Sequence, residues 1–267
     1  MENETSRIDC YPKKFRFYHF LGAEYVESFL RTGLLKVTQL GHSNDYFEYK
    51  PGFLNSNVEH DWNIAIKGGE PCVVCLSAKM SSPVMWGHYG KRGKGACLVF
   101  DIPLLERSAL RKSAFDNTRD FYAYMIDLLH MPIVKVSYND KRQVIKYMPP
   151  YESQEFSDLL IEIASSKTLD WQYEEEYRII VDTKYLIARN GNFFFKGMLP
   201  FCSAVLLGWD SPISRAYLSA VLREENRAEV RVVDVYPSLT KCEISSCICD
   251  GELYQDTPVV ELDAWGV

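Results

Sequence analysis

The apolar residues of the chain form short runs that polar turns separate from one another. The runs at residues 72–77 and 96–101 are continuous, which is typical of strands buried on both faces. Residues 34–40 alternate well enough between apolar and polar side chains to predict another strand. Further strands are predicted at residues 15–21, 133–138, 176–181, 193–196, 204–207 and 230–235.

Helical spacing of apolar residues predicts four helices among these strands. They lie at residues 22–32, 115–130, 153–167 and 212–223. Gly33 supplies the usual stop for the first helix, and Pro212 suits the first turn of the last one. Residues 41–61 are polar and rich in glycine, proline and asparagine, which predicts a long loop that contacts a ligand or acts as a lid.

The order of these elements favours one fold class. Strand and helix do not alternate strictly, so we expect an α+β fold with a mixed or split β-sheet core and flanking helices, rather than a doubly wound parallel sheet. Residues 1–14 form a polar leader, and no repeat or linker divides residues 15–267, which we expect to be a single domain.

Charge and hydropathy narrow the classes of partner. The net charge of −6 argues against general affinity for nucleic-acid backbones, which calls for a basic surface, although Lys91, Arg92 and Lys94 form a local basic patch. No apolar run approaches the roughly 20 residues that cross a bilayer, and the N-terminus lacks the apolar region of a secretory signal. We therefore expect a cytoplasmic protein without a membrane partner.

The eight cysteines favour buried thiols over a metal site. Cys72 and Cys75 have the spacing of a metal-binding pair and lie in an apolar, strand-like segment. A structural zinc site usually needs a second well-spaced pair, and Cys247 and Cys249, with a single residue between them, are a poor one.

The first candidate for chemistry is an acidic segment that runs into a predicted strand. Side chains alternate along a strand, so Glu174, Glu176 and Arg178 are expected on one face. Burying these charges is costly unless they are paired, which favours a rim or a cleft. Close carboxylates can raise one pKa, as acid–base work requires. The alternative is a solvated strand edge with a local ion pair.

Three further segments carry candidate residues. His88 and Tyr89 lie in a predicted loop between two buried strands, where they contact a ligand or, alternatively, help to close the core. His19 follows Tyr18 on the opening strand, where a histidine is most often a satisfied core residue. Asn44 belongs to an Asn-Asp pair that, by itself, indicates turn chemistry. Phosphate-loop, dinucleotide-fold and zinc-protease motifs are absent from the sequence.

Taken together, these segments resemble a bacterial family of uncharacterised proteins. Its members share a strand–helix opening, an Asn-Asp…Glu loop, a Met-Trp-x-His-Tyr segment and a Trp-x-x-Glu-x-Glu-Tyr-Arg segment. Here they are Tyr18-His19-Phe20, Asn44-Asp45 with Glu48, Met85-Trp86-Gly87-His88-Tyr89, and Trp171 with Glu174, Glu176, Tyr177 and Arg178. Tyr46 follows the Asn-Asp pair where the family often has proline, so the shape of this loop is expected to differ from that of the family. The activity of that family is unassigned, so this resemblance implies no function.

A second resemblance concerns the opening of the chain. Tyr18-His19-Phe20, the short helix and Gly33-Leu34-Leu35 are similar to the opening of DNA- and RNA-directed ADP-ribosyltransferases. In those enzymes a histidine after the first strand's tyrosine contacts NAD, and a late strand carries a catalytic glutamate. Their fold is a split pair of β-sheets with flanking helices, so this likeness implies an ADP-ribosyltransferase-like fold with NAD as substrate.

This likeness implies a role for each candidate residue. Glu174 or Glu176 would stabilise the cation that forms when the glycosidic bond of NAD breaks, with His88 as a further catalytic group. The NAD-contacting residues would be Tyr18, His19, Asn44, Tyr46, Tyr89 and Arg178. Of these, Tyr46 or Tyr89 would stack on nicotinamide, and Arg178 would meet the pyrophosphate or hold the carboxylates.

Two classes of function remain open at this point. The first is an ADP-ribosyltransferase or NAD glycohydrolase, as a bacterial toxin or phage-defence effector, whose acceptor is a nucleic acid, a protein or water. The second is a non-catalytic module on the same fold that binds a nucleotide or a protein. The acidic charge counts against a third class, a metal-independent nuclease. The sequence leaves the oligomeric state undetermined.

Overall fold

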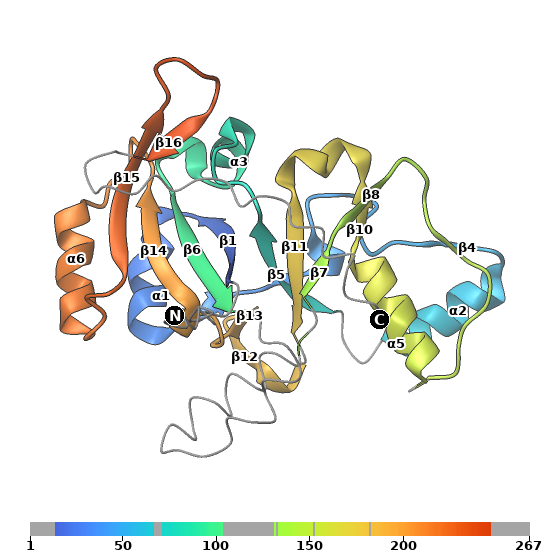
Figure 1. Ribbon diagram of the computed structural model, residues 1–267. Coiled ribbons are helices and arrows are strands. Elements are labelled where there is room, and N and C mark those ends of the chain that lie inside the picture. The colour runs from blue at the N-terminus through green and yellow to red at the C-terminus, as the bar shows by residue number, and fades with distance from the viewer. Residues whose placement is uncertain are drawn as a thin grey trace, which may run out of the picture.

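A nine-stranded mixed β-sheet forms the centre of the computed structural model, which describes residues 14–66, 71–103, 131, 133–151, 153–181 and 183–246. The strand order is β16-β15-β14-β6-β1-β5-β11-β7, and β3 pairs with β5 beside that path (Figure 1). The pair β14–β15 is parallel, whereas the other neighbours in this sheet are antiparallel. The prediction of an α+β fold with a mixed sheet is therefore confirmed.

The strands of this sheet are β1 (Lys14–Leu21), β3 (Thr38–Gln39), β5 (Cys72–Ser77), β6 (Ala96–Pro103), β7 (Ile133–Lys135), β11 (Glu176–Val181), β14 (Cys202–Leu207), β15 (Arg231–Pro237) and β16 (Ile244–Ser246). Smaller sheets pair β12 (Leu186–Arg189), β13 (Asn192–Phe195) and β2 (Leu35–Lys36), β10 (Ser166–Thr168) with β8 (Ser137–Asn139), and β4 (Gly52–Phe53) with β9 (Val144–Ile145).

The helices are α1 (Val26–Thr32), α2 (Ser56–Ala65), α3 (Pro83–His88), α5 (Gln154–Ala164) and α6 (Arg215–Glu224). Short 3-10 helices are η1 (Ala23–Tyr25), η2 (Leu40–His42), η4 (Lys91–Gly93), η5 (Leu169–Glu174), η6 (Thr183–Tyr185) and η7 (Leu199–Phe201). In Figure 1, α1 and α6 lie beside β14 and β15, while α2 and α5 lie at the opposite end of the sheet.

The junction between β1 and β5 divides the large sheet into two well-paired parts. These strands share one residue pair, Tyr18 with Ser77, whereas β1 pairs with β6 over its whole length, from Lys14 to Leu21. On the other side, β5 pairs with β11 from Cys72 to Ser77. Figure 1 shows the two parts, β16 to β1 and β5 to β7, on either side of this junction.

Three apolar clusters cover the two faces of the sheet. The largest packs Phe29 and Leu30 of α1 and Leu218 and Val221 of α6 against one face. On the opposite face, α3 supplies Trp86 to a second cluster over β1, β6 and β14. Residues of α2 and α5 build the third cluster over β5, around Trp62, Val73 and Ile163. The second and third clusters leave a part of this face, near the β1–β5 junction, for polar side chains.

Several predicted boundaries change in the structure. The predicted loop that carries His88 and Tyr89 is wrong as far as His88, which ends α3. This helix begins after Ser82, whose hydroxyl accepts from the Met85 amide, and has Pro83 in its first turn. The predicted helix at 153–167 ends at Ala164, and the predicted loop at 41–61 contains η2, β4 and the start of α2.

Two more predictions differ in part, and one lies outside the described residues. The predicted strand at 133–138 divides into β7 and β8 around Val136, which is buried. The helix at the predicted Pro212 position begins later, at Arg215, with Ser214 as its cap. The predicted helix at residues 115–130 and nearly all of the polar leader, residues 1–13, lie outside the described residues.

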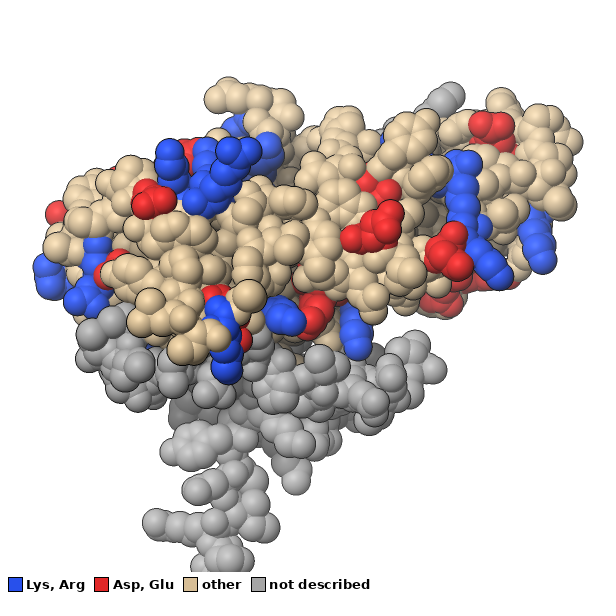
Figure 2. Space-filling view, turned by 90° about the horizontal axis from the view of Figure 1, so that it is seen from above, with Lys and Arg blue, Asp and Glu red and all other residues tan. Residues whose placement is uncertain are grey.

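Both signs of charge occur on the face of the molecule that carries α3. Figure 2, which looks down on the end of the molecule that carries α3 in Figure 1, shows one compact group of lysine and arginine side chains, with the two signs interspersed elsewhere. The described residues on the face that Figure 2 shows form no continuous basic stripe of the kind that general nucleic-acid binding calls for. No helix in the described ranges has the length and apolar character needed to cross a membrane.

Candidate functional site

A cavity of about 740 Å3 lies at the β1–β5 junction and brings together most of the predicted site residues. Its walls include Tyr18, His19, Asn44, Tyr89, Glu174, Glu176 and Arg178. Volumes of roughly 300–1,000 Å3 are usual for small-molecule sites. The cavity is therefore large enough for a nucleotide-sized ligand.

The sheet register explains why tyrosine and carboxylate meet here. Tyr18 pairs with Ser77 across β1 and β5, and Ser77 pairs with Glu176 across β5 and β11. Directly paired residues project from the same face of a sheet, so these three side chains form a row across the junction. Arg178, two residues after Glu176 on β11, lies on the same face. The alternative interpretation, a solvated strand edge with a local ion pair, is wrong, because β11 is buried and lies between β5 and β7.

Arg178 holds two of the carboxylates. Its Nε atom lies 2.9 Å from Glu176 Oε1, and its Nη2 atom lies 2.9 Å from Glu176 Oε2. The two side chains therefore form a bidentate pair. Nη2 also donates to Glu48, and Nη1 donates to the carbonyl of Ala164 at the end of α5. The Arg178 side chain is fully buried, so its charge is compensated by protein groups rather than by solvent.

Lys167 is the second cation of the cluster and comes from β10, outside the large sheet. Its Nζ lies 2.5 Å from Glu174 Oε2, 3.3 Å from Glu176 Oε2 and 3.9 Å from Glu48 Oε2. It also lies 4.8 Å from the centre of the Trp171 ring. One ammonium group thus contacts all three carboxylates.

Glu174 does not lie on the strand, although alternation had placed it there. It ends η5, and Glu175, with φ of 44°, makes a left-handed turn between it and β11. The turn directs Glu174 toward Tyr89, whose hydroxyl donates to Glu174 Oε1 at 2.5 Å. Ser77 fixes this end of η5 by donating to the carbonyl of Glu174 at 2.7 Å.

The segment that carries Glu48 is attached to β10 by its own hydrogen bonds. Asp45 accepts from the amide and the hydroxyl of Thr168 at 3.0 and 2.8 Å, and from the amide of Phe47 at 2.9 Å. Ser43 donates to Glu48. These bonds hold a loop carboxylate at the centre of the cluster, so the segment does more than make a turn.

Burial and neighbouring charges give the three carboxyl groups different acidities. Burial raises the pKa of Glu48 to about 7 against the opposing effect of Arg178 and Lys167. Burial also raises the pKa of Glu174, although Lys167 opposes it. Burial acts on Glu176 in the same sense, but Arg178 and Lys167 outweigh it and lower its pKa to about 2. Glu176 is thus fixed as an anion, while Glu48 and Glu174 can gain a proton much more easily.

His19 lies at the junction as a neutral imidazole. Its Nδ1 is 2.8 Å from the carbonyl of Cys75, which requires the proton to be on that nitrogen. Burial lowers the pKa of His19 more than this hydrogen bond raises it. Its side chain lines the cavity, consistent with a polar contact to a ligand.

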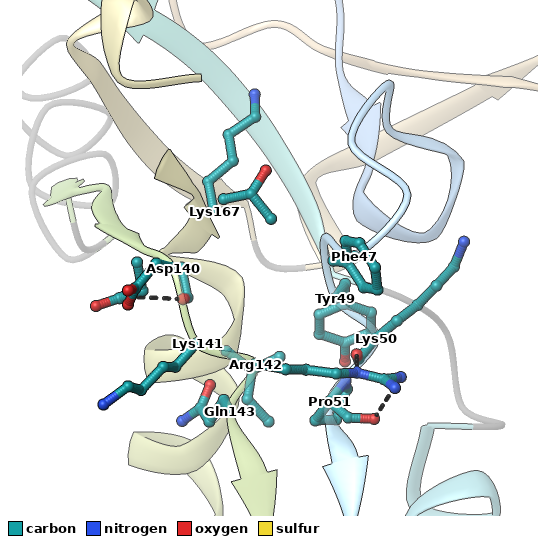
Figure 3. Close-up of a pocket in the computed structure, with 13 residues that line it drawn as sticks. Phe47, Tyr49, Lys50, Pro51, Asp140, Lys141, Arg142, Gln143 and Lys167 are labelled. Atoms are coloured by element: carbon teal, nitrogen blue, oxygen red, sulfur yellow. Dashed lines mark hydrogen bonds between the residues drawn. The ribbon is translucent and has the colours of Figure 1, made fainter. Parts of the chain in front are cut away.

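A second, smaller cavity of about 150 Å3 lies on the other side of Lys167. In Figure 3, the Lys167 side chain extends away from Lys141 and Arg142, which lie at the opposite side of this cavity. Arg142 donates to the carbonyls of Lys50 and Pro51 at 2.9 and 3.1 Å. The cavity is too small for a nucleotide, and the ammonium group of Lys167 points away from it, toward the carboxylates of Glu48, Glu174 and Glu176.

Two predicted site residues lie elsewhere. His88 is exposed at the end of α3, where Nδ1 lies 2.9 Å from the Tyr173 hydroxyl, and it does not line the large cavity. Tyr46 points into solvent with 73% of its surface exposed. The catalytic role of His88 and the stacking role of Tyr46 have no geometric basis in this arrangement, because α3 and the loop turn both side chains away from the cavity.

Sequence reasoning missed Lys167 and gave Glu48 no role of its own. Lys167 was expected at the end of a helix, and the polar Ser165-Ser166 pair before it was the available signal that the helix ends earlier. Among the described residues, no group of three or more His, Cys, Asp or Glu side chains is arranged to hold a metal ion. The Cys247–Cys249 pair lies outside the described residues.

One comparison with known proteins gives a match, and it covers the two segments that meet at Tyr89 and Glu174. Neither a curated protein nor a solved structure matches the chain. Residues 85–179, which run from the start of the Met-Trp-Gly-His-Tyr segment into β11, are similar to a family described as "Protein of unknown function (DUF2971)".

Proposed function

We propose that the protein binds NAD in the large cavity and breaks the bond between nicotinamide and ribose. The ADP-ribosyl group would then pass to water or to a macromolecular acceptor. The observation that carries this proposal is the position of Glu174 on the cavity wall, hydrogen-bonded to Tyr89 and next to two further carboxylates. The single-pair junction of the sheet supports an ADP-ribosyltransferase-like fold.

The charge of the cluster suits this reaction. Above the pKa of Glu48, which is about 7, the three ionised carboxylates of Glu48, Glu174 and Glu176 outnumber the two cations, Lys167 and Arg178, by one negative charge. Breaking the glycosidic bond sends the bonding electrons to nicotinamide and leaves a cation on the ribose. A carboxylate held beside that cation stabilises the transition state by roughly several kcal/mol. An oxyanion hole stabilises a developing anion on the same principle, with the charges reversed.

Glu174 is better suited than Glu176 to act on the substrate. Both oxygens of Glu176 are held by Arg178, which fixes it as an anion and as a positioning residue. Glu174 has a raised pKa, so after stabilising the cation it can take the proton that the attacking hydroxyl or water loses on bonding to ribose C1′. Tyr89 orients the carboxylate for both steps.

The remaining cavity residues supply orientation. Tyr18 and His19 come from the same strand, and Asn44 lies 3.5 Å from the Tyr89 hydroxyl through its Nδ2 atom. His19 and Asn44 offer hydrogen bonds to the ribose hydroxyls without adding charge, whereas Tyr18 is fully buried and packs in the second apolar cluster beneath this wall. Arg178 is committed to carboxylates and to the Ala164 carbonyl, so we assign it to positioning rather than to the pyrophosphate.

One observation favours a second function, a non-catalytic module that binds a nucleotide or a protein. Arg178, Lys167 and Glu176 are almost completely buried and mutually paired, which also describes a cluster whose task is to fix the shape of the site. The two functions differ in what they predict for NAD, because only the first consumes it.

The test is the release of nicotinamide from NAD by the purified protein, with water alone and with added nucleic acid or protein as acceptor. We expect release by the wild type and a loss of roughly 100-fold or more in Glu174→Gln. Glu175→Gln is the matched control, since Glu175 is partly exposed and pairs with Lys79 at the surface. Absence of release with every acceptor, or equal rates in wild type and Glu174→Gln, would refute the catalytic proposal.

A further inference from the structure

The large cavity has two ends of different chemistry. The carboxylate cluster lies on the face of the large sheet that Tyr18 and Ser77 share, and this is one end of the cavity. The other end is lined by β2 and β13, whose Leu35 and Phe195 belong to the apolar cluster on the opposite face. Apolar side chains at this second end include Phe29, Leu34, Val37 and Phe194. A ligand that fills the cavity therefore meets charges at one end and mainly hydrocarbon at the other.

The wall at the second end is a well-defined piece of structure. Asn190 and Gly191, with φ of 49° and 71°, make the tight turn between β12 and β13, as expected for Asn-Gly in a hairpin. Lys36 pairs directly with Phe194, and the amide of Val37 donates to the carbonyl of Phe193 at 3.0 Å. Lys36 and Phe194 consequently project side by side from the same face of this small sheet.

Lys36 differs from the other cations of the cavity. Lys167 and Arg178 are each paired with carboxylates, whereas within the described part of the chain no carboxylate lies within ion-pair distance of Lys36. An anionic group of a ligand is attracted by this uncompensated cation, whereas the two cations of the cluster are already paired with carboxylates. The Phe194 ring beside it offers a surface on which a nucleobase can stack.

We propose that Lys36 and Phe194 form the subsite for the nucleoside diphosphate part of the ligand, with Lys36 at the phosphates and Phe194 at the base. This inference rests on the proposed function for the identity of the ligand. It gives the ligand a direction: the phosphates and base lie toward β2 and β13, and the ribose that reacts lies toward Glu174.

Calorimetric titrations of the full chain with ADP-ribose, adenosine and inorganic pyrophosphate test the subsite. We expect Lys36→Gln to raise the Kd of ADP-ribose about tenfold, to weaken pyrophosphate binding and to leave the Kd of adenosine unchanged, because only the first two ligands carry phosphate. Phe194→Leu should raise the Kd of both ADP-ribose and adenosine. The loss in Lys36→Gln should shrink as the salt concentration rises.

Lys135→Gln is the matched control, because Lys135 is also an exposed lysine on a strand but does not line the cavity. Thermal unfolding of each variant verifies that it is folded. Unchanged ADP-ribose binding in Lys36→Gln, an equal loss in Lys135→Gln, or no binding of any of these ligands to the wild type would overturn the subsite. The outcome is separable from catalysis: Lys36-dependent binding without nicotinamide release refutes the reaction alone, and release with Lys36-independent binding refutes the subsite alone.

Discussion

The hydroxyl of Tyr89 lies 2.5 Å from Glu174 Oε1 and joins two segments that are far apart in the chain. Tyr89 follows α3, and Glu174 ends η5, just before β11. The family match at residues 85–179 contains both partners. The contact thus joins the first part of the matched stretch to its last part: Tyr89 supplies a donor for the carboxylate that η5 places on the cavity wall.

Tyr89→Phe is expected to shift the pH dependence of nicotinamide release. The Tyr89 hydrogen bond lowers the pKa of Glu174 and so opposes the effect of burial. Without it the pKa of Glu174 rises, and the acidic limb of the pH–rate profile moves to higher pH. Tyr173→Phe is the control, because the Tyr173 hydroxyl bonds His88 instead. An acidic limb at the same pH in Tyr89→Phe and wild type would contradict the assigned role of Glu174.

Lys167→Met should destabilise the fold strongly. The substitution leaves three buried carboxylates with Arg178 as their remaining cation, and breaking a buried pair in this way costs roughly 3–5 kcal/mol. Denaturant unfolding at pH 7 measures this loss, and lower pH should reduce it as the carboxyl groups are protonated. Lys79→Met, which removes an exposed pair with Glu175, should cost about 1 kcal/mol or less. Equal losses in the two variants would show that the cluster is not held by Lys167.

The sequence predicts the hydrophobic frame of this protein better than its polar centre. Strands such as β5 and β6 are visible as apolar runs, because burial on both faces excludes polar residues from them. Alternation also placed Glu176 and Arg178 on one face correctly, since that relationship lies within a single strand.

The relationships that the sequence did not reveal depend on contacts between distant segments. Lys167 reaches the cluster because β10 pairs with β8 in parallel, and Glu48 reaches it because Asp45 is bound to Thr168. Neither pairing has a local pattern. The α3 helix is different, because Ser82 followed by Pro83 is a recognisable helix start. The helix has only six residues, which is too short for the periodicity of its apolar side chains to indicate it.

Glu48 should make stability fall as pH rises through the weakly acidic range. Its pKa of about 7 in the folded protein exceeds the ordinary value of 4.5, so between these values the folded state binds the proton more tightly than the unfolded state does. In that window the contribution of Glu48 falls by up to about 3 kcal/mol, and Glu48→Gln should remove this slope.

The measurement is the difference in unfolding free energy between Glu48→Gln and wild type, at several pH values from 4.5 to 7. We expect the difference to grow in favour of the variant with rising pH. Glu162→Gln, on the exposed side of α5, should give a constant difference. A constant difference for Glu48→Gln as well would mean that its carboxyl group titrates normally.

His19 should make the free energy of unfolding fall as the pH is lowered below neutral, which is opposite to the effect of Glu48. Burial lowers its pKa from the ordinary value of 6.5, so the unfolded state binds the proton more tightly, and the contribution of His19 to stability is lost as pH falls through 6.5. The wild type should therefore lose stability relative to His19→Asn over this range. Unfolding by denaturant at pH 7.5 and 5.5 measures the change, and a difference that is independent of pH would contradict a neutral, buried imidazole.

A crystal structure of Glu174→Gln grown with NAD tests the central claim most directly. The account predicts NAD in the large cavity, with the ribose carbon that bears nicotinamide within about 4 Å of the residue 174 side chain, a distance near that of reacting groups. The diphosphate should lie toward Lys36. A cavity without ligand at saturating NAD, or NAD bound with that carbon away from Glu174, would contradict it.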